Sequence, residues 1–185
     1  MKSKNHVTIG LTNPKSPSNV GSVLRAAGNY EVTQVVYTGK RYAQAAKFSG
    51  FKHNTDTKNI ADVIPLIALD DFINSKASLN NITSDTRVIC VDLVEGAIPL
   101  PHFIHPNSAL YIFGPEDGTI SQAVIDFADD VVYVPTVGCM NLAASVNVVL
   151  YDRLAKSALM QADNNQADNV LIRQSRDTNN KVKVK

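Results

Sequence analysis

The chain has 185 residues, of which 44% are hydrophobic and 19% charged, and its formal net charge is +1. This length allows one domain with a sizeable core, and the composition is ordinary for a globular protein. The longest apolar run, "VIPLIAL" at 63–69, is too short to span a membrane, and the N-terminus has no apolar signal core. The only cysteines, Cys90 and Cys139, favour a cytoplasmic location over a disulfide scaffold.

The charge is distributed unevenly along the chain. Residues 1–60 carry nine Lys or Arg against two acidic residues, residues 61–160 carry four against twelve, and residues 161–185 carry five against three. A basic block on a nearly neutral chain indicates a local anionic partner, and nucleic acid is the commonest such partner. A solvated basic surface without a partner is the alternative.

Alternating strand-like and helix-like segments predict an α/β fold. The strand-like segments are rich in β-branched and aromatic residues and lie at 7–11, 34–38, 87–92, 109–113 and 131–135. Their apolar runs do not alternate cleanly, which is typical of parallel strands buried on both faces. Helices are predicted between and after them at 19–30, 68–77, 119–128 and about 140–160. This order favours a mostly parallel sheet flanked by helices.

The segment "NVGSVLRAAGNY" at 19–30 has apolar residues at i, i+3, i+4 and i+7, which predicts an amphipathic helix. Asn19 suits its N-cap. Arg25 is its only charged residue, and the neighbours three and four positions away are small or polar. Since no acidic residue there can pair with Arg25, that face leaves room for another backbone or a ligand.

Two segments fit neither a strand nor a helix pattern. Residues 40–60 are basic, polar and aromatic, and we interpret them as a long surface loop. Residues 161–185 are rich in Asn and Asp, and we expect a polar, flexible tail. Without an internal repeat or a linker, residues 1–160 are expected to form a single domain.

The stretch "IFGPEDGTIS" at 112–121 runs from a predicted strand through a glycine-containing turn into a helix that Thr119 or Ser121 can cap. Ligands of open α/β sheets bind at the carboxyl ends of the strands. Gly114 and Gly118 allow a close approach of the backbone, although an ordinary turn has the same composition. The chain contains no dinucleotide fingerprint and no P-loop.

The stretch "VPTVGCMNLAASVNVVLYDRLAK" at 134–156 predicts a helix that is apolar nearly all round and therefore buried on several faces, in part by a second subunit. Asn141 lies where this helix begins, whereas Ser145 and Asn147 are expected to bond to the backbone or across a subunit contact. The four histidines show no metal-ligand spacing, so no metal site is expected. Cys139 has no evident His partner for thiol chemistry.

Three of these segments together resemble the motifs of the SPOUT superfamily, specifically the TrmH (SpoU) class of RNA 2′-O-ribose methyltransferases. Residues 11–30 carry the pattern N-x-G-x-x-x-R from Asn19 to Arg25. Residues 110–121 are similar to the motif FGxExxG, and residues 134–156 to the third motif of the class. The order and separation of the three also fit.

The resemblance implies a parallel α/β sheet with a C-terminal trefoil knot at about 87–156, and a homodimer. It further implies transfer of a methyl group from S-adenosylmethionine to a ribose 2′-OH of tRNA or rRNA, without a metal. The loops that would bind the cofactor contain Leu93, Gly114, Val134, Cys139, Met140 and Leu142.

The resemblance also implies roles for the motif residues Asn19, Arg25, Glu116 and Asn141. Arg25 would organise a phosphate and the ribose and relay the proton, because a guanidinium is not a free base in proteins. Glu116 would hold the geometry of the motifs, and Asn141 the hydroxyl group or its own loop. RNA binding would fall to the basic residues Lys15, Arg25, Lys40, Arg41, Lys47 and Lys52.

The sequence departs from the family pattern in the third motif. Cys139 stands where the class has a serine, and the stretch from Pro135 to that position is about three residues shorter than is usual for the class. A catalytically weak or inactive knotted protein that binds RNA or assists assembly is therefore the alternative. An unrelated nucleotide-binding domain would require the match of three motifs to be a coincidence.

Overall fold

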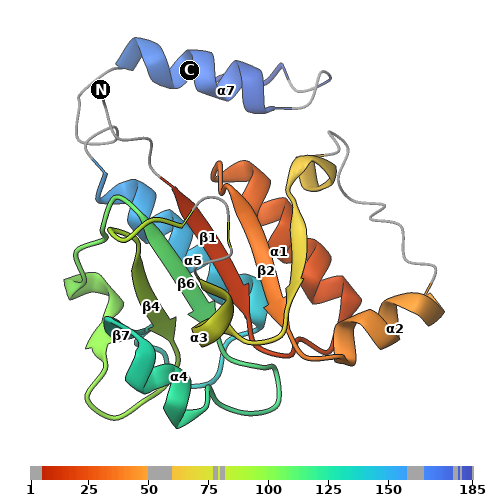
Figure 1. Cartoon of the computed structure of the whole chain (residues 1–185). Helices are drawn as coiled ribbons and strands as arrows, with labels where there is room; N and C mark the ends of the chain where they lie inside the picture. Colours follow the sequence, from red (N-terminus) through yellow and green to blue (C-terminus); the bar gives the residue numbers. More distant parts are fainter. Residues whose placement is uncertain are drawn as a thin grey trace.

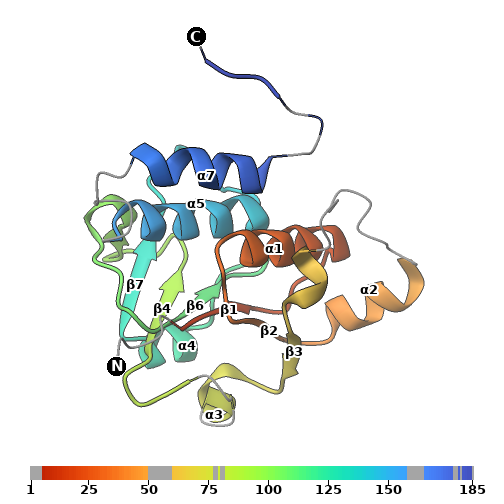
Figure 2. The ribbon, with the colours of Figure 1, turned by 90° about the horizontal axis from the view of Figure 1, so that it is seen from above.

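The computed structural model describes residues 6–49, 60–76, 79, 82–157, 165–176, 179 and 181–184. Within them, seven parallel strands form one sheet in the order β3-β2-β1-β6-β4-β7-β5. Helices cover both faces (Figures 1 and 2): α1 and α5 lie on one side, α3 and α4 on the other. The prediction of a parallel sheet flanked by helices is therefore confirmed.

The strands are β1 (Val7–Leu11), β2 (Gln34–Thr38), β3 (Leu66–Leu69), β4 (Arg87–Val91), β5 (Ile98–Pro99), β6 (Ala109–Phe113) and β7 (Asp130–Tyr133). The helices are α1 (Pro17–Asn29), α2 (Arg41–Ser49), α3 (Phe72–Ser75), α4 (Gln122–Phe127), α5 (Leu142–Ala155) and α7 (Asn165–Ser175), with 3-10 turns η1 (Ile60–Val63) and η3 (Leu100–His102).

The central strands divide their side chains between two cores, as β6 illustrates. All five of its residues are buried. Tyr111 and Phe113 belong to the core under α1 and α5, whereas Leu110 and Ile112 belong to the core on the side of α3 and α4. A strand that is buried on both faces is apolar on both, which is why the pattern does not alternate.

Two short strands at the ends of the sheet were not predicted. Residues 68–77 were expected to be helical, but Leu66–Leu69 pairs with β2, and only Phe72–Ser75 forms a helix, capped by Asp71. The strand β5 has two residues. The strand β3 is apolar but only partly buried, so at this edge pairing with β2 decides the strand where the apolar run alone did not.

The basic segment 40–60 is not all loop, because Arg41–Ser49 forms α2. Its alanines together with Gln44 and Lys47 are good helix formers, and the ring of Tyr42 packs edge-on against Tyr37 at a centroid distance of 5.1 Å. The remainder of the segment, 50–59, lies outside the described residues. In the polar C-terminal segment, Asn165–Ser175 forms α7, which had not been predicted.

The N-terminus of α1 also differs from the prediction. Ser16, not Asn19, is the N-cap, and its hydroxyl accepts a hydrogen bond from Asn19 N at 3.4 Å. Pro17 occupies the first helical position, which suits its fixed φ angle. The side chain of Asn19 is thereby available for contacts outside the helix. In the part of the chain that the structure describes, no helix has the length and hydropathy needed to cross a membrane.

Candidate active site

The loops that follow β4, β6 and β7 enclose a pocket of about 140 Å³ at the carboxyl ends of these strands. The three strands are neighbours in the sheet, so segments far apart in sequence meet there. All six residues predicted to bind a cofactor line this pocket: Leu93, Gly114, Val134, Cys139, Met140 and Leu142. Its wall combines glycine backbone with apolar side chains, as is typical of a small-molecule site.

Asp92 holds two of the pocket loops together and was missed by the sequence reasoning. Its carboxylate accepts hydrogen bonds from Leu93 N at 2.8 Å and from Ile120 N at 2.9 Å. A Cβ atom on Gly114 would lie 2.9 Å from Asp92 Oδ2, so this position has no room for a side chain. An acidic residue directly after a buried strand was the available signal.

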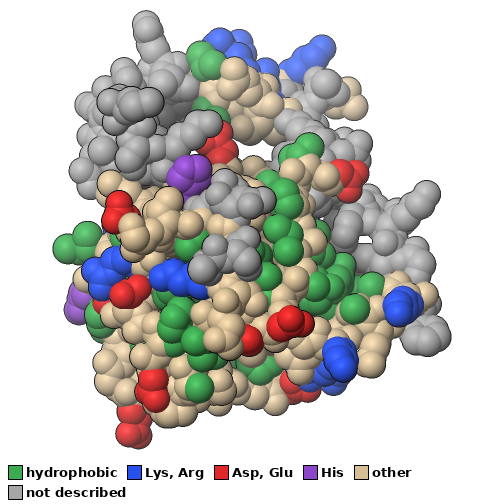
Figure 3. All heavy atoms as spheres, viewed as in Figure 1, with side chains coloured by type: hydrophobic (Ala, Val, Ile, Leu, Met, Phe, Trp, Pro, Cys, Tyr) green, Lys and Arg blue, Asp and Glu red, His purple; other side chains and the backbone are tan. Residues whose placement is uncertain are grey.

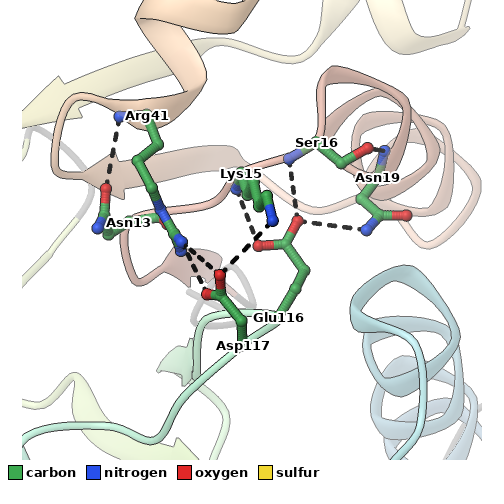
Figure 4. A network of polar contacts seen from close by, with 7 residues as sticks. All are labelled: Asn13, Lys15, Ser16, Asn19, Arg41, Glu116 and Asp117. Carbon is green, nitrogen blue, oxygen red and sulfur yellow. Dashed lines mark hydrogen bonds and ion pairs between the residues drawn. The ribbon is translucent and has the colours of Figure 1, made fainter.

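Glu116 joins the loop after β6 to the start of α1. Its carboxylate accepts hydrogen bonds from Lys15 N at 2.8 Å, Ser16 N at 3.1 Å and Asn19 Nδ2 at 3.2 Å, as Figure 4 shows. Asn141 completes the connection because its Nδ2 donates to Asn19 Oδ1 at 3.0 Å. Three of the four predicted catalytic residues, one from each motif, therefore lie in one hydrogen-bonded chain.

The other end of the Asn141 side chain caps α5. Its Oδ1 accepts from Ala143 N at 2.9 Å and from Ala144 N at 3.4 Å. An N-cap with a second contact through its amide fixes the helix start relative to α1. Ser145 and Asn147 bond to backbone carbonyls of the same helix, which confirms the backbone alternative for both.

The hydrogen bonds to Glu116 determine its charge. Partial burial raises the pKa of this carboxyl group, but the backbone N–H groups of Lys15 and Ser16 and the amide of Asn19 outweigh burial and lower it. A carboxylate stabilised in this way is a fixed anion at neutral pH. Glu116 is thus suited to holding the loops and not to donating a proton.

Arg25 lies apart from this network. It is exposed on α1, it does not line the pocket, and it makes no hydrogen bond or ion pair with the part of the chain that the structure describes. Six residues of helix place its Cα about 9 Å along the axis from that of Asn19. Its guanidinium is therefore available to a partner outside the chain's own pocket.

The predicted RNA-binding residues differ in their surroundings. Lys15 and Arg41 pair with Asp117, at 3.8 Å and 2.7 Å, whereas Lys40 and Lys47 are exposed. Lys52 lies outside the described residues.

Neither a metal site nor a reactive buried thiol is apparent. The described residues contain no group of three or more His, Cys, Asp or Glu side chains that could hold a metal ion. Cys90 is buried, and burial with the nearby Asp92 charge raises the pKa of its thiol to about 12. Cys139 is exposed at the pocket.

The fold is similar to those of solved RNA methyltransferases. An AdoMet-bound rRNA methyltransferase from Sinorhizobium meliloti aligns with a TM-score of 0.63 and 16% identity, over 82% of this chain and 56% of that one. The TrmH/SpoU tRNA modifying enzyme of A. aeolicus aligns with 0.67 and 13%, over 94% and 88%. An RNA 2′-O ribose methyltransferase aligns with 0.61 and 18%, over 84% and 58%. The chain thus spans little more than half the length of two of these proteins.

Comparison with curated protein sequences gives no significant match. A family model, in contrast, matches residues 6–151, which include the first two motif segments, the third as far as residue 151, the pocket and the network of Asn19, Glu116 and Asn141. The chain therefore belongs to the SpoU rRNA Methylase family.

Proposed function

We propose that the protein is an S-adenosylmethionine-dependent RNA methyltransferase that acts on a ribose 2′-OH of tRNA or rRNA. The observation that carries the proposal is the hydrogen-bonded chain of Asn19, Glu116 and Asn141. It joins one residue from each motif beside a pocket lined by the predicted cofactor loops. Family membership and the AdoMet-bound and 2′-O-methylating structural neighbours support the same activity.

The pocket residues fit S-adenosylmethionine. Leu93, Val134, Met140 and Leu142 offer apolar contacts to an adenine ring, and the lack of a side chain at Gly114 lets a ligand approach the backbone. When bound, the cofactor supplies a methyl group on a positively charged sulfur. The protein contributes orientation, because in-line transfer mainly requires the acceptor oxygen to be held against the methyl carbon.

Within this proposal Arg25 binds a phosphate and the ribose of the RNA. A guanidinium stays protonated in proteins, so we assign it the orientation of the 2′-hydroxyl. It relays the hydroxyl proton only by giving one of its own protons to water in the same step. Glu116 and Asn141 act through the loops that they hold. Asn19 connects them and fixes the start of the helix that carries Arg25.

Arg25 would reach a pocket across a homodimer. Its exposure and its absence from the chain's own pocket support this arrangement, as do the exposed side chains of Tyr151 and Leu154 on α5, which packs against α1. The trefoil knot at about 87–156 and a cytoplasmic location belong to the same proposal.

Mapping of 2′-O-methylation in total RNA, with and without the gene, tests the activity. We expect one or a few sites to disappear on deletion and to return with the wild-type gene. The substitution Arg25→Ala should lower transfer at least about a hundredfold, because the acceptor is no longer oriented. Ser22→Ala, one turn earlier on the same exposed face, is the matched control.

S-adenosylmethionine binding by calorimetry and thermal unfolding complete this experiment. Both should be unchanged in Arg25→Ala. Normal methylation by this variant would refute the role of Arg25. A wild-type protein that binds RNA but neither binds S-adenosylmethionine nor methylates would instead favour the knotted RNA-binding protein suggested by Cys139.

A further inference from the structure

The loop after β6 makes a second connection, directly beside that of Glu116. Asp117 points away from Glu116 toward α2 (Figure 4), where Arg41 Nη1 donates to both of its carboxylate oxygens at 2.7 and 2.8 Å. The pKa of Asp117 is held below its ordinary value chiefly by this hydrogen bond. Arg41 is the first residue of α2, so the ion pair ties the pocket loop to that helix.

Arg41 also binds the loop after β1 with its other nitrogens. Its Nε and Nη2 donate to Asn13 O at 3.0 and 2.6 Å, and its backbone N lies 3.5 Å from Asn13 Oδ1. Asn13 adopts a positive φ of 41° to present these groups. Gly39, with φ of 80°, has no room for a Cβ, which would collide with the side chain of Asn13. Loops after β1, β2 and β6 are therefore closely packed around one guanidinium.

This geometry commits each nitrogen of the guanidinium to an acceptor within the fold. Its side chain is 31% exposed, and all three of its nitrogens already donate to protein acceptors. Lys40, the preceding residue, is exposed and forms no such pair among the described residues. Two adjacent basic residues thus have different surroundings, although the sequence gives both the same RNA-binding interpretation.

We propose that Arg41 is a positioning residue that couples the cofactor pocket to the basic helix α2 through Asp117 and Asn13, and not a ligand of RNA phosphate. The inference rests on the proposed function and adds to it. Pro115, Glu116 and Gly118 line the pocket on either side of Asp117. A shift of α2 is therefore transmitted to the pocket wall, and ordering of that wall is transmitted to α2.

The substitutions Asp117→Asn and Arg41→Gln separate the two roles. If Arg41 bound phosphate, Arg41→Gln would weaken binding of total tRNA and leave S-adenosylmethionine binding unchanged. As a positioning pair, Asp117→Asn and Arg41→Gln should both weaken S-adenosylmethionine binding about fivefold, the low end of coupling between sites. The double variant should weaken it no further than Arg41→Gln alone, because the interaction with Asp117 is already lost in that variant.

Arg41→Lys provides a further distinction. Lysine keeps the positive charge, but its single ammonium cannot reproduce the planar fork that binds Asp117 and Asn13 together. It should therefore behave like Arg41→Gln in calorimetry with S-adenosylmethionine. Lys40→Gln is the matched control, since it removes the same charge from the adjacent position. It should weaken binding of total tRNA and leave S-adenosylmethionine binding unchanged.

Amide hydrogen exchange of the ligand-free chain tests the same coupling without an activity assay. Exchange in 12–16 and 114–121 should rise about fivefold in Arg41→Gln and Asp117→Asn, but not in Lys40→Gln, because local opening follows the lost contacts. Unchanged exchange in both variants, or unchanged S-adenosylmethionine binding by Arg41→Gln, would overturn the inference. Failure of the wild-type chain to bind S-adenosylmethionine would refute the proposed function, while the exchange data would still decide the role of Arg41.

Discussion

At the scale of single residues, the neighbours Glu116 and Asp117 show how one loop is held in two directions. Glu116 accepts hydrogen bonds from the start of α1, and Asp117 from the start of α2. Because successive side chains in this loop point to different helices, a change at either position should have its own consequence. The pKa of Glu116 allows one such consequence, the way in which stability depends on pH, to be predicted with its direction.

The substitution Glu116→Gln should destabilise the protein by about 1 kcal/mol at neutral pH, because a neutral amide is a weaker acceptor for two backbone N–H groups. The folded protein holds the pKa of Glu116 below the ordinary value of 4.5. The stabilisation is therefore complete above that value and is lost as the pH falls through the lowered pKa. Urea unfolding across this pH range should show the two proteins converging in acid. A stability difference that does not change with pH would contradict the assignment.

At the scale of elements, α5 is anchored at both ends. Asn141 fixes its start, and its last two turns carry Asp152 and Arg153, which bind the segment around residues 105–107. His105 lies between Tyr111 and Asp152, with contacts of 2.6 Å at Nδ1 and 2.9 Å at Nε2. The helix that supplies part of the pocket wall is thus tied to the central strand β6.

The proton arrangement of this cluster follows from its acceptors. Burial lowers the pKa of His105, although Asp152 opposes the shift, so the imidazole is neutral at neutral pH. Since the carboxylate of Asp152 only accepts, Nε2 carries the hydrogen and Nδ1 accepts from the hydroxyl of Tyr111. That hydroxyl oxygen accepts in turn from Arg153 Nη1 at 3.1 Å.

Tyr111→Phe should therefore destabilise the fold by about 1–3 kcal/mol, because the buried Nδ1 of His105 loses its donor. Phenylalanine keeps the packing of the fully buried ring, so no cavity forms. Equilibrium unfolding in urea measures the loss. Tyr133→Phe, which removes the hydroxyl of a half-buried tyrosine on β7 that forms no side-chain hydrogen bond among the described residues, is the control and should be nearly neutral. Equal stability of Tyr111→Phe and the wild type would refute the proton arrangement.

At the scale of the whole molecule, the small net charge conceals a separation of basic and acidic segments. Lys and Arg side chains occur over α2 and over α7, at separate places in the view of Figure 3. The acidic residues fall mostly in the later half of the domain, where Asp92, Glu116 and Asp117 accept hydrogen bonds around the pocket. These three carboxylates thus accept hydrogen bonds from other parts of the fold, whereas the side chain of Lys47 remains exposed on α2.

Binding of total tRNA should weaken with salt in proportion to the phosphate contacts. Lys47→Gln should reduce the slope of log affinity against log salt concentration by about one unit, as expected for a single lost phosphate contact. Gln44→Ala, exposed on the same helix, should leave the slope unchanged. Filter binding at several salt concentrations measures both. An unaltered slope in Lys47→Gln would remove this residue from the RNA interface.

The sequence by itself determined the central strands and the motif segments. The bounds of β1, β2 and β6 match the predicted 7–11, 34–38 and 109–113, because a strand buried on both faces is mostly apolar and is recognisable without its neighbours. The pattern from Asn19 to Arg25 and the glycine-containing loop after β6 were likewise readable as local motifs. The six residues that the family resemblance implied for the cofactor loops line one pocket.

Only the tertiary structure decided which side chains meet. The edge strands β3 and β5 form by pairing with neighbours, and the cap of α1 is Ser16 because Asn19 bonds instead to Glu116 and Asn141. Asp92 and Arg41 likewise act through partners in other loops. Such contacts join positions far apart in sequence at the carboxyl edge of the sheet. No local pattern encodes them, because their energy depends on where the packed strands bring the loops together.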